Sequence, residues 1–66
     1  MRMRYVDRSG NLYTVEVRRR GNGYCIYLDG DFWATADTRR DVDCELRQIE
    51  QKFDIIKHFA KEVTKN

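Results

Sequence analysis

The stretch DGDFWATADTRRDVD, Asp29 to Asp43, decides the fold because a turn, a strand and a helix start follow one another within it. The Asp-Gly pair is a turn signal, FWAT is rich in strand-forming residues, and Thr38 with Asp41 three residues later resembles a helix capping box. Phe32 and Trp33 are neighbours in the predicted strand, so their side chains should point to opposite faces. One of these rings is therefore expected in the core and the other on the outer surface.

Upstream of this stretch, short segments alternate between apolar and polar residues, which is the pattern of half-buried antiparallel strands. Gly-containing turn sequences separate them, namely RSGN, RGNG and LDG. The sequence predicts strands at about 1–7, 12–19, 24–28 and 32–36, joined by hairpins into a meander.

The lengths of the turns determine which residues pair across the strands. For the first turn we prefer a three-residue loop, with Gly10 in the left-handed conformation, because a shorter loop would put Arg4 and Val15 on the same face. The pairs predicted across the first two turns are Arg2–Glu16, Met3–Val15, Arg4–Thr14, Tyr5–Tyr13, Val15–Leu28 and Val17–Ile26.

The third turn leaves two alternatives. A two-residue Asp29-Gly30 loop pairs Ile26 with Trp33 and turns Phe32 outward. A three-residue loop that also includes Leu28 pairs Ile26 with Phe32 and turns Trp33 outward. We prefer the longer loop, because Phe32 and the two alanines of the strand then share the core face.

After the strands, apolar residues recur at alternating spacings of four and three residues, which is a strong helix pattern. These residues are Val42, Leu46, Ile49, Phe53, Ile56, Ala60 and Val63. The sequence therefore predicts a helix at about 39–64, capped at Thr38. The predicted fold is a single α+β domain over residues 1–66, a four-stranded antiparallel meander (β-β-β-β-α) with one long C-terminal helix packed on one sheet face.

This helix would be too long for its sheet. At about 1.5 Å per residue it would measure about 39 Å, whereas strands of five to seven residues span about 17–23 Å. The uncovered half would expose Ile55, Ile56, Phe59 and Val63, an unusual apolar patch for a monomer. We predict a homodimer or a partner helix on these residues. The alternative is a more tilted helix with a frayed end.

Catalysis and metal binding find little support in the sequence. Cys25 and Cys44 lack a CxxC spacing and the single His58 cannot complete a zinc site, so two free thiols are expected. Asp29 and Asp31 are explained by the turn between them. We expect no enzyme activity, no metal and no cofactor. No apolar stretch is long enough to span a membrane and no signal peptide is recognisable, which predicts a cytoplasmic protein without membrane contact.

The outer sheet face is the predicted working surface, since it would combine cations for phosphates with flat side chains for bases. Its candidate binding residues are Arg2, Arg4, Arg18, Arg20, Tyr27, Trp33 and Thr35. Three interpretations remain open: a face that binds nucleic acid, a face that binds a protein complex, and a solvated face with one incidental Trp.

The segment YTVEVRRRGNGYCIYLDGDFWATADTRRDV resembles the ethylene-response-factor type of DNA-binding domain, and it is similar to the arm-site-binding domains of tyrosine integrases. The resemblance rests on the strand Phe32-Trp33-Ala34-Thr35 and on Asp37-Thr38 before the helix. It implies a three-stranded sheet in the DNA major groove, with Arg18, Arg20, Tyr27 and Trp33 as contacts. In size and style the chain is also similar to phage and mobile-element accessory proteins, including anti-CRISPR inhibitors.

Overall fold

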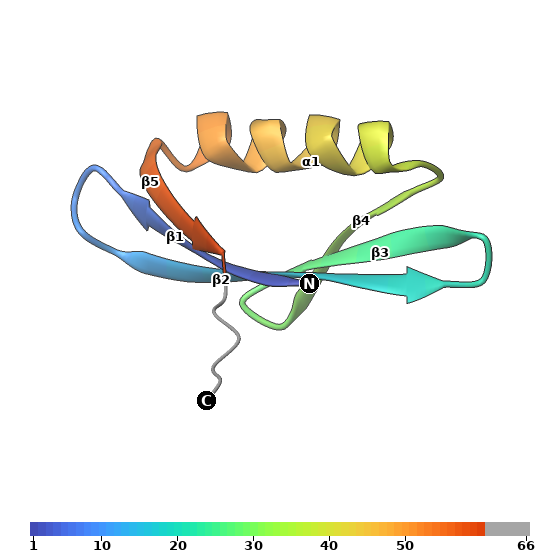
Figure 1. Ribbon diagram of the computed structural model, residues 1–66. Coiled ribbons are helices and arrows are strands. Elements are labelled where there is room, and N and C mark those ends of the chain that lie inside the picture. The colour runs from blue at the N-terminus through green and yellow to red at the C-terminus, as the bar shows by residue number, and fades with distance from the viewer. Residues whose placement is uncertain (61–66) are drawn as a thin grey trace.

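The computed structural model describes residues 1–60 and shows one helix laid across one face of an antiparallel sheet (Figure 1). The elements in chain order are β1 (Arg2–Asp7), β2 (Leu12–Arg20), β3 (Gly23–Leu28), β4 (Asp31–Ala36), α1 (Arg39–Lys52) and β5 (Ile55–Ala60). The sheet has 5 strands in the order β4-β3-β2-β1-β5. The α+β class is confirmed, but the sheet has one strand more than predicted and the helix lies in mid-chain.

The first two hairpins have the predicted registers. Across the first turn Tyr5 pairs with Tyr13 and Arg2 with Glu16, and across the second Val17 pairs with Ile26. Gly10 adopts a φ of 90°, which is the left-handed conformation expected of it in a three-residue loop. The β1–β2–β3 meander therefore follows from alternation and turn chemistry alone.

The third hairpin differs from the prediction. Asp29 and Gly30 have φ values of 53° and 87°, so they form the two-residue loop of a type I′ hairpin, with Tyr27 opposite Phe32. The register then shifts between Ile26 and Tyr27, and Ile26 pairs with Ala34. Trp33 is the extra residue of this bulge.

The two-residue turn reverses the predicted positions of the two aromatic rings. Trp33 packs against the core, whereas Phe32 is 59% exposed. The prediction that Phe32 faces inward and Trp33 outward is wrong, because the chain turns through the two-residue Asp29-Gly30 loop, the alternative that was not preferred since strict alternation would then have turned Ala34 and Ala36 outward. An extra residue interrupts that alternation, so Trp33 and the following Ala34 both lie toward α1.

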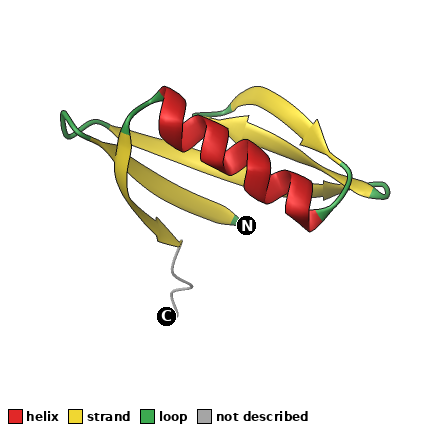
Figure 2. Ribbon diagram, turned by 90° about the horizontal axis from the view of Figure 1, so that it is seen from above, coloured by secondary structure: helices red, strands yellow, loops and turns green. Residues whose placement is uncertain are grey.

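The core lies between α1 and the sheet. Its buried apolar residues are Met3, Tyr5, Val15, Val17, Ile26, Ala36, Val42, Leu46 and Ile49. The helix begins where predicted, because the Thr38 side chain accepts a hydrogen bond of 3.1 Å from the backbone N–H of Asp41. Seen from above, α1 runs diagonally across the strands (Figure 2).

The helix ends much earlier than the apolar spacing predicted. Phe53 is the C-cap, and Asp54 takes the left-handed conformation with a φ of 58°. The backbone N–H of Arg8 donates to the Asp54 carbonyl at 3.1 Å, and the Arg8 Nε donates to Asp54 Oδ2 at 2.9 Å. The chain then turns back as β5, which pairs antiparallel with β1.

The predicted helix of about 39–64 is therefore wrong beyond Lys52. Ile55, Ile56 and Phe59 belong to a strand rather than to a helical patch, and Val63 lies outside the described residues. The physical reason is that β5 satisfies the open edge of β1, while a continuing helix would have run past the sheet. A helical dimer surface is consequently not formed by these three residues. Among the described residues, no helix combines the length and apolar character needed to cross a membrane.

Candidate functional site

The face of the sheet that points away from α1 is the candidate site, and we call it the outer face. Among residues 1–60, no helix or strand lies over it (Figure 1). The pairings and the alternation of side chains assign its members. They are Arg2, Arg4 and Val6 of β1; Leu12, Thr14, Glu16, Arg18 and Arg20 of β2; Cys25 and Tyr27 of β3; Phe32 and Thr35 of β4; and Lys57 and Phe59 of β5.

The outer face is strongly cationic. Its basic members are Arg2, Arg4, Arg18, Arg20 and Lys57, and its acidic member is Glu16. On the opposite side of the molecule, α1 contains equal numbers of basic and acidic residues. The excess positive charge of the protein is therefore concentrated on the face that α1 leaves open.

Glu16 organises two of these arginines. Its Oε2 lies 3.2 Å from Arg18 Nε and 3.8 Å from Arg2 Nη2. The hydrogen bond from Arg18, together with the charges of both arginines, lowers the pKa of Glu16 although partial burial opposes the shift. The Arg18 and Arg2 side chains are still 60% and 53% exposed, so each retains N–H donors for another partner.

The remaining cations of the outer face are more open. Arg4, Arg20 and Lys57 are exposed, and within the described part of the chain they form no ion pair. Arg4 lies on β1, the strand beside the β5 edge, between Thr14 of β2 and Phe59 of β5. This position puts the guanidinium-bearing residue Arg4 directly beside Phe59 on the outer face.

Two phenylalanine rings stand exposed on the outer face. Phe32 is 59% exposed on one edge strand, and Phe59 is 48% exposed on the other. Tyr27 is less available, because the Arg18 guanidinium lies 5.0 Å from its ring centroid and Phe32 meets it edge-on at 6.1 Å and 79°. Exposed aromatic side chains on a cationic surface are a common feature of binding sites.

Trp33, the aromatic residue that the sequence placed on this face, belongs to the other side of the sheet. Its Nε1–H donates to Glu45 Oε1 of α1 at 3.1 Å, and its ring lies 6.1 Å from that of Phe53. Lys52 lies over the ring with its Nζ 5.9 Å from the centroid. Trp33 therefore fastens β4 to the helix and is not part of the outer face.

The other predicted residues divide between the outer face and elsewhere. Arg2, Arg4, Arg18, Arg20, Tyr27 and Thr35 lie on it as expected. Phe59, predicted on a helical patch, joins them from β5, while Ile55 packs on the core and Ile56 is 58% exposed at the bulge of β5.

Sequence reasoning missed Phe32 and Lys57 as members of this face. The Asp29-Gly30 pair is the strongest short signal for a two-residue hairpin and could have placed Phe32 outward. Lys57 could be found only after β5 had been recognised.

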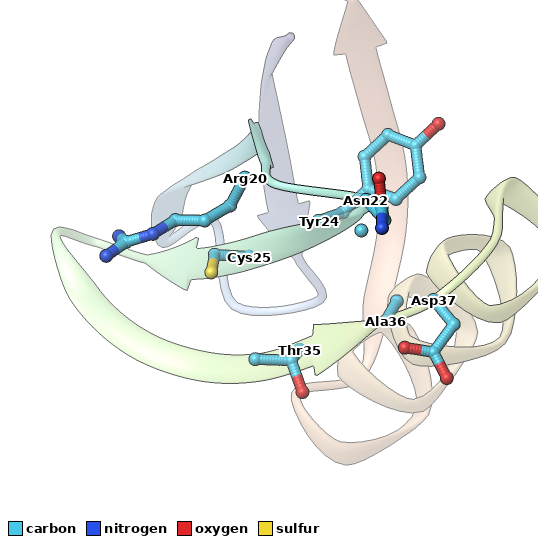
Figure 3. A pocket seen from close by; sticks show the side chains of 8 residues that line it. Arg20, Asn22, Tyr24, Cys25, Thr35, Ala36 and Asp37 are labelled. Atoms are coloured by element: carbon cyan, nitrogen blue, oxygen red, sulfur yellow. The ribbon is translucent and has the colours of Figure 1, made fainter.

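A shallow pocket of about 420 Å³ extends the outer face at one end of β3 and β4 (Figure 3). It is lined by Arg20, Asn22, Gly23, Tyr24, Cys25, Thr35, Ala36 and Asp37. Gly23 is needed there, because a Cβ at this position would lie 2.7 Å from the carbonyl oxygen of Ala36. In this pocket the Thr35 and Cys25 side chains lie near Arg20, the last residue of β2.

The buried polar groups hold the fold together. Asp7 accepts hydrogen bonds from the backbone N–H groups of Ser9 and Asn11, from the Asn11 side chain and from the Tyr13 hydroxyl. Burial alone would raise the pKa of Asp7, but these hydrogen bonds outweigh it and the pKa is lowered. Burial, and the carboxylate of Glu50 at 3.2 Å from the hydroxyl, raise the pKa of Tyr5. The Asp7 hydrogen bonds stabilise the β1–β2 hairpin, and the Tyr5–Glu50 hydrogen bond joins β1 to α1.

The described residues contain no cluster of three or more His, Cys, Asp or Glu side chains that could hold a metal ion. Comparisons of the chain with protein-family models, with curated proteins and with solved structures found no match. The proposed function therefore depends on the chemistry of the outer face.

Proposed function

We propose that this protein is a small non-catalytic module that binds nucleic acid through its outer face. The observation that carries the proposal is the segregation of charge and aromatic rings. Exposed cations and two exposed phenylalanines share one open sheet face, while the charges of α1 on the other side are balanced. Cations of this kind bind phosphates, and aromatic rings bind bases or sugars.

The geometry of the cations supports this function over a purely solvated face. Arg4, Arg20 and Lys57 form no ion pair with an acidic side chain among the described residues. A solvated sheet face is normally a mixture of both charge signs without large apolar rings. Nucleic acid is a polyanion with flat bases, so it would neutralise these unpaired cations and cover the exposed phenylalanine rings at the same time.

A protein partner is the second candidate, and the exposed aliphatic residues favour it. Leu12 is 62% and Ile56 is 58% exposed, and neither side chain gains from contact with phosphate. An inhibitor or adaptor, for example one directed against a host-defence complex, would use such residues together with Phe59. The two functions differ in their salt response, since an apolar interface depends less on ionic strength than phosphate contacts do.

The test is a titration of labelled single-stranded and duplex oligonucleotides at two salt concentrations, followed by fluorescence anisotropy. About four phosphate contacts predict that log K falls with log salt at a slope of about −3. Arg4→Ala should weaken binding about three- to tenfold and reduce the slope by about one.

Arg47→Ala is the matched control, because it removes the same charge from the exposed side of α1. It should leave affinity within about twofold. An equal loss in both variants would indicate a general charge effect without a defined site. No binding to any oligonucleotide at low salt would refute the proposal.

A further inference from the structure

We infer that the outer face takes single-stranded nucleic acid, with unpaired bases stacked on Phe32 and Phe59. This inference rests on the proposed function and narrows it to one form of the polymer. Two observations carry it: the width of the sheet and the positions of the two rings.

The sheet is too wide to enter a duplex groove face-on. With strands about 4.8 Å apart, five strands measure about 19 Å between the outer axes. The major groove is about 12 Å wide and admits a helix or a narrow β-ribbon. A three-stranded sheet would measure about 10 Å, but the four strands β4-β3-β2-β1 already measure about 14 Å, and β5 beside β1 widens the face further.

The exposed rings are suited to unpaired bases. In a duplex the base faces are stacked on one another, so the outside of the helix offers Phe32 and Phe59 only phosphates, sugars and base edges. In a single strand the bases can turn toward a protein surface and stack on aromatic side chains. The two exposed rings therefore gain from contact with a single strand and gain little from a duplex.

The rings and the cations lie along one path across the sheet. Phe32 is on β4 and Phe59 is on β5, the two edge strands, and Arg4 pairs directly with Phe59. Arg2 and Arg18 lie between these edges, held by Glu16. A single nucleic-acid strand with stacked bases advances about 3.4 Å per nucleotide, so about six nucleotides would cover the roughly 19 Å between the edge strands β4 and β5. A nucleic-acid strand in an extended conformation would need fewer.

The experiment compares labelled 12-mers of thymidine and of uridine with a 12-base-pair duplex, using the intact protein at low salt. The single strands should bind at least about tenfold more tightly than the duplex. DNA and RNA share the phosphate and stacking chemistry, and a difference between them would show whether the 2′-hydroxyl is also contacted.

Substitutions at one position separate stacking from simple apolar contact. Phe59→Leu keeps an apolar side chain but removes the ring, and it should weaken single-strand binding about five- to tenfold. Phe59→Tyr keeps the ring and should bind within about twofold of the unmodified protein. The same pair at Phe32 repeats the test on the other edge strand, and thermal unfolding checks that each variant is folded.

The outcomes distinguish this inference from the proposed function. If the duplex binds as tightly as the single strands, the inference is overturned while nucleic-acid binding stands. If Phe59→Leu and Phe59→Tyr lose affinity equally, stacking is excluded. If neither polymer binds, both the inference and the proposed function fail.

Discussion

Phe32 and Trp33 show how the length of one turn assigns two aromatic rings to different roles. The two-residue Asp29-Gly30 turn places Trp33 on the side of α1, where it donates to Glu45 and contacts Phe53. Phe32 is left on the outer face against Tyr27. The ring that stabilises the protein and the ring that is available for binding are thus neighbours in the chain, which makes their substitution a direct test of the assignment.

Trp33→Ala should destabilise the protein by about 2–3 kcal/mol, because it removes a large, partly buried ring and its hydrogen bond to α1. Phe32→Ala should cost less than about 1 kcal/mol, since only an exposed cross-strand contact with Tyr27 is lost. Urea unfolding measures both values. The opposite order, with Phe32→Ala the more damaging, would mean that the three-residue turn, with Phe32 inward, is correct.

At the scale of the element, α1 and β5 show why an apolar pattern can mispredict a boundary. Val42, Leu46 and Ile49 of α1 face the core of the protein. The same four-three spacing continues through Phe53 and Ile56. The continuation is accidental, because Ile56 lies in a strand. Neither Gly nor Pro marks the junction, and Asp54 adopts a left-handed conformation that Asp only occasionally takes.

Local chemistry was sufficient for the strands and the helix start, because each depended on neighbouring residues. Alternation predicted β1 to β4, Gly10 set the first register, and Thr38 marked the helix cap. The β4 bulge and β5 depend on tertiary contacts, which no short pattern encodes. The sequence did contain one indication of the early helix end, because the predicted helix was too long for its sheet. That mismatch was interpreted as a dimer surface, whereas the helix ends at Lys52.

The outer face was partly predictable for the same reason. Its arginines and Tyr27 follow from the registers of the first two hairpins. Phe32 required the two-residue form of the third turn, and Phe59 and Lys57 required the long-range pairing of β5 with β1. Residues placed by the first two turns were therefore found, while these three residues of the edge strands were not.

The end of α1 can be tested by comparing two substitutions of Asp54. Asp54→Ala and Asp54→Gly both remove the exposed ion pair with Arg8, so that loss cancels in the comparison. In the left-handed conformation a residue with a Cβ costs about 1–2 kcal/mol, so the Gly variant should be about 1 kcal/mol the more stable. If residue 54 were inside a helix, Gly would instead be about 1 kcal/mol less stable than Ala. The sign of the difference, measured by urea unfolding, decides between the two structures.

For the whole molecule, the position of β1 links the fold to the proposed mode of binding. With β5 in place, β1 is an inner strand, the sheet is complete on both sides of it, and Phe59 reaches the outer face. Without β5, β1 would be an edge strand and the sheet would be narrower. The pairing of β5 with β1 therefore sets the topology and places Phe59, the second ring proposed to stack on a single-stranded ligand, on the outer face.

Amide hydrogen exchange can test this pairing strand by strand. The backbone N–H of Asp7 donates to Asn11, so the odd-numbered amides of β1 point toward β2. The N–H of Arg8 donates to Asp54, so the even-numbered amides, including those of Arg4 and Val6, point toward β5. If β5 is paired, Arg4 and Val6 should exchange about as slowly as Met3 and Tyr5, because all four are hydrogen-bonded in the same cooperative unit. Rapid exchange at Arg4 and Val6, with Met3 and Tyr5 still protected, would show that β1 is an edge strand. Phe59 would then not be held on the outer face by the pairing of β5, and the proposed path for a single strand would lose one of its two rings.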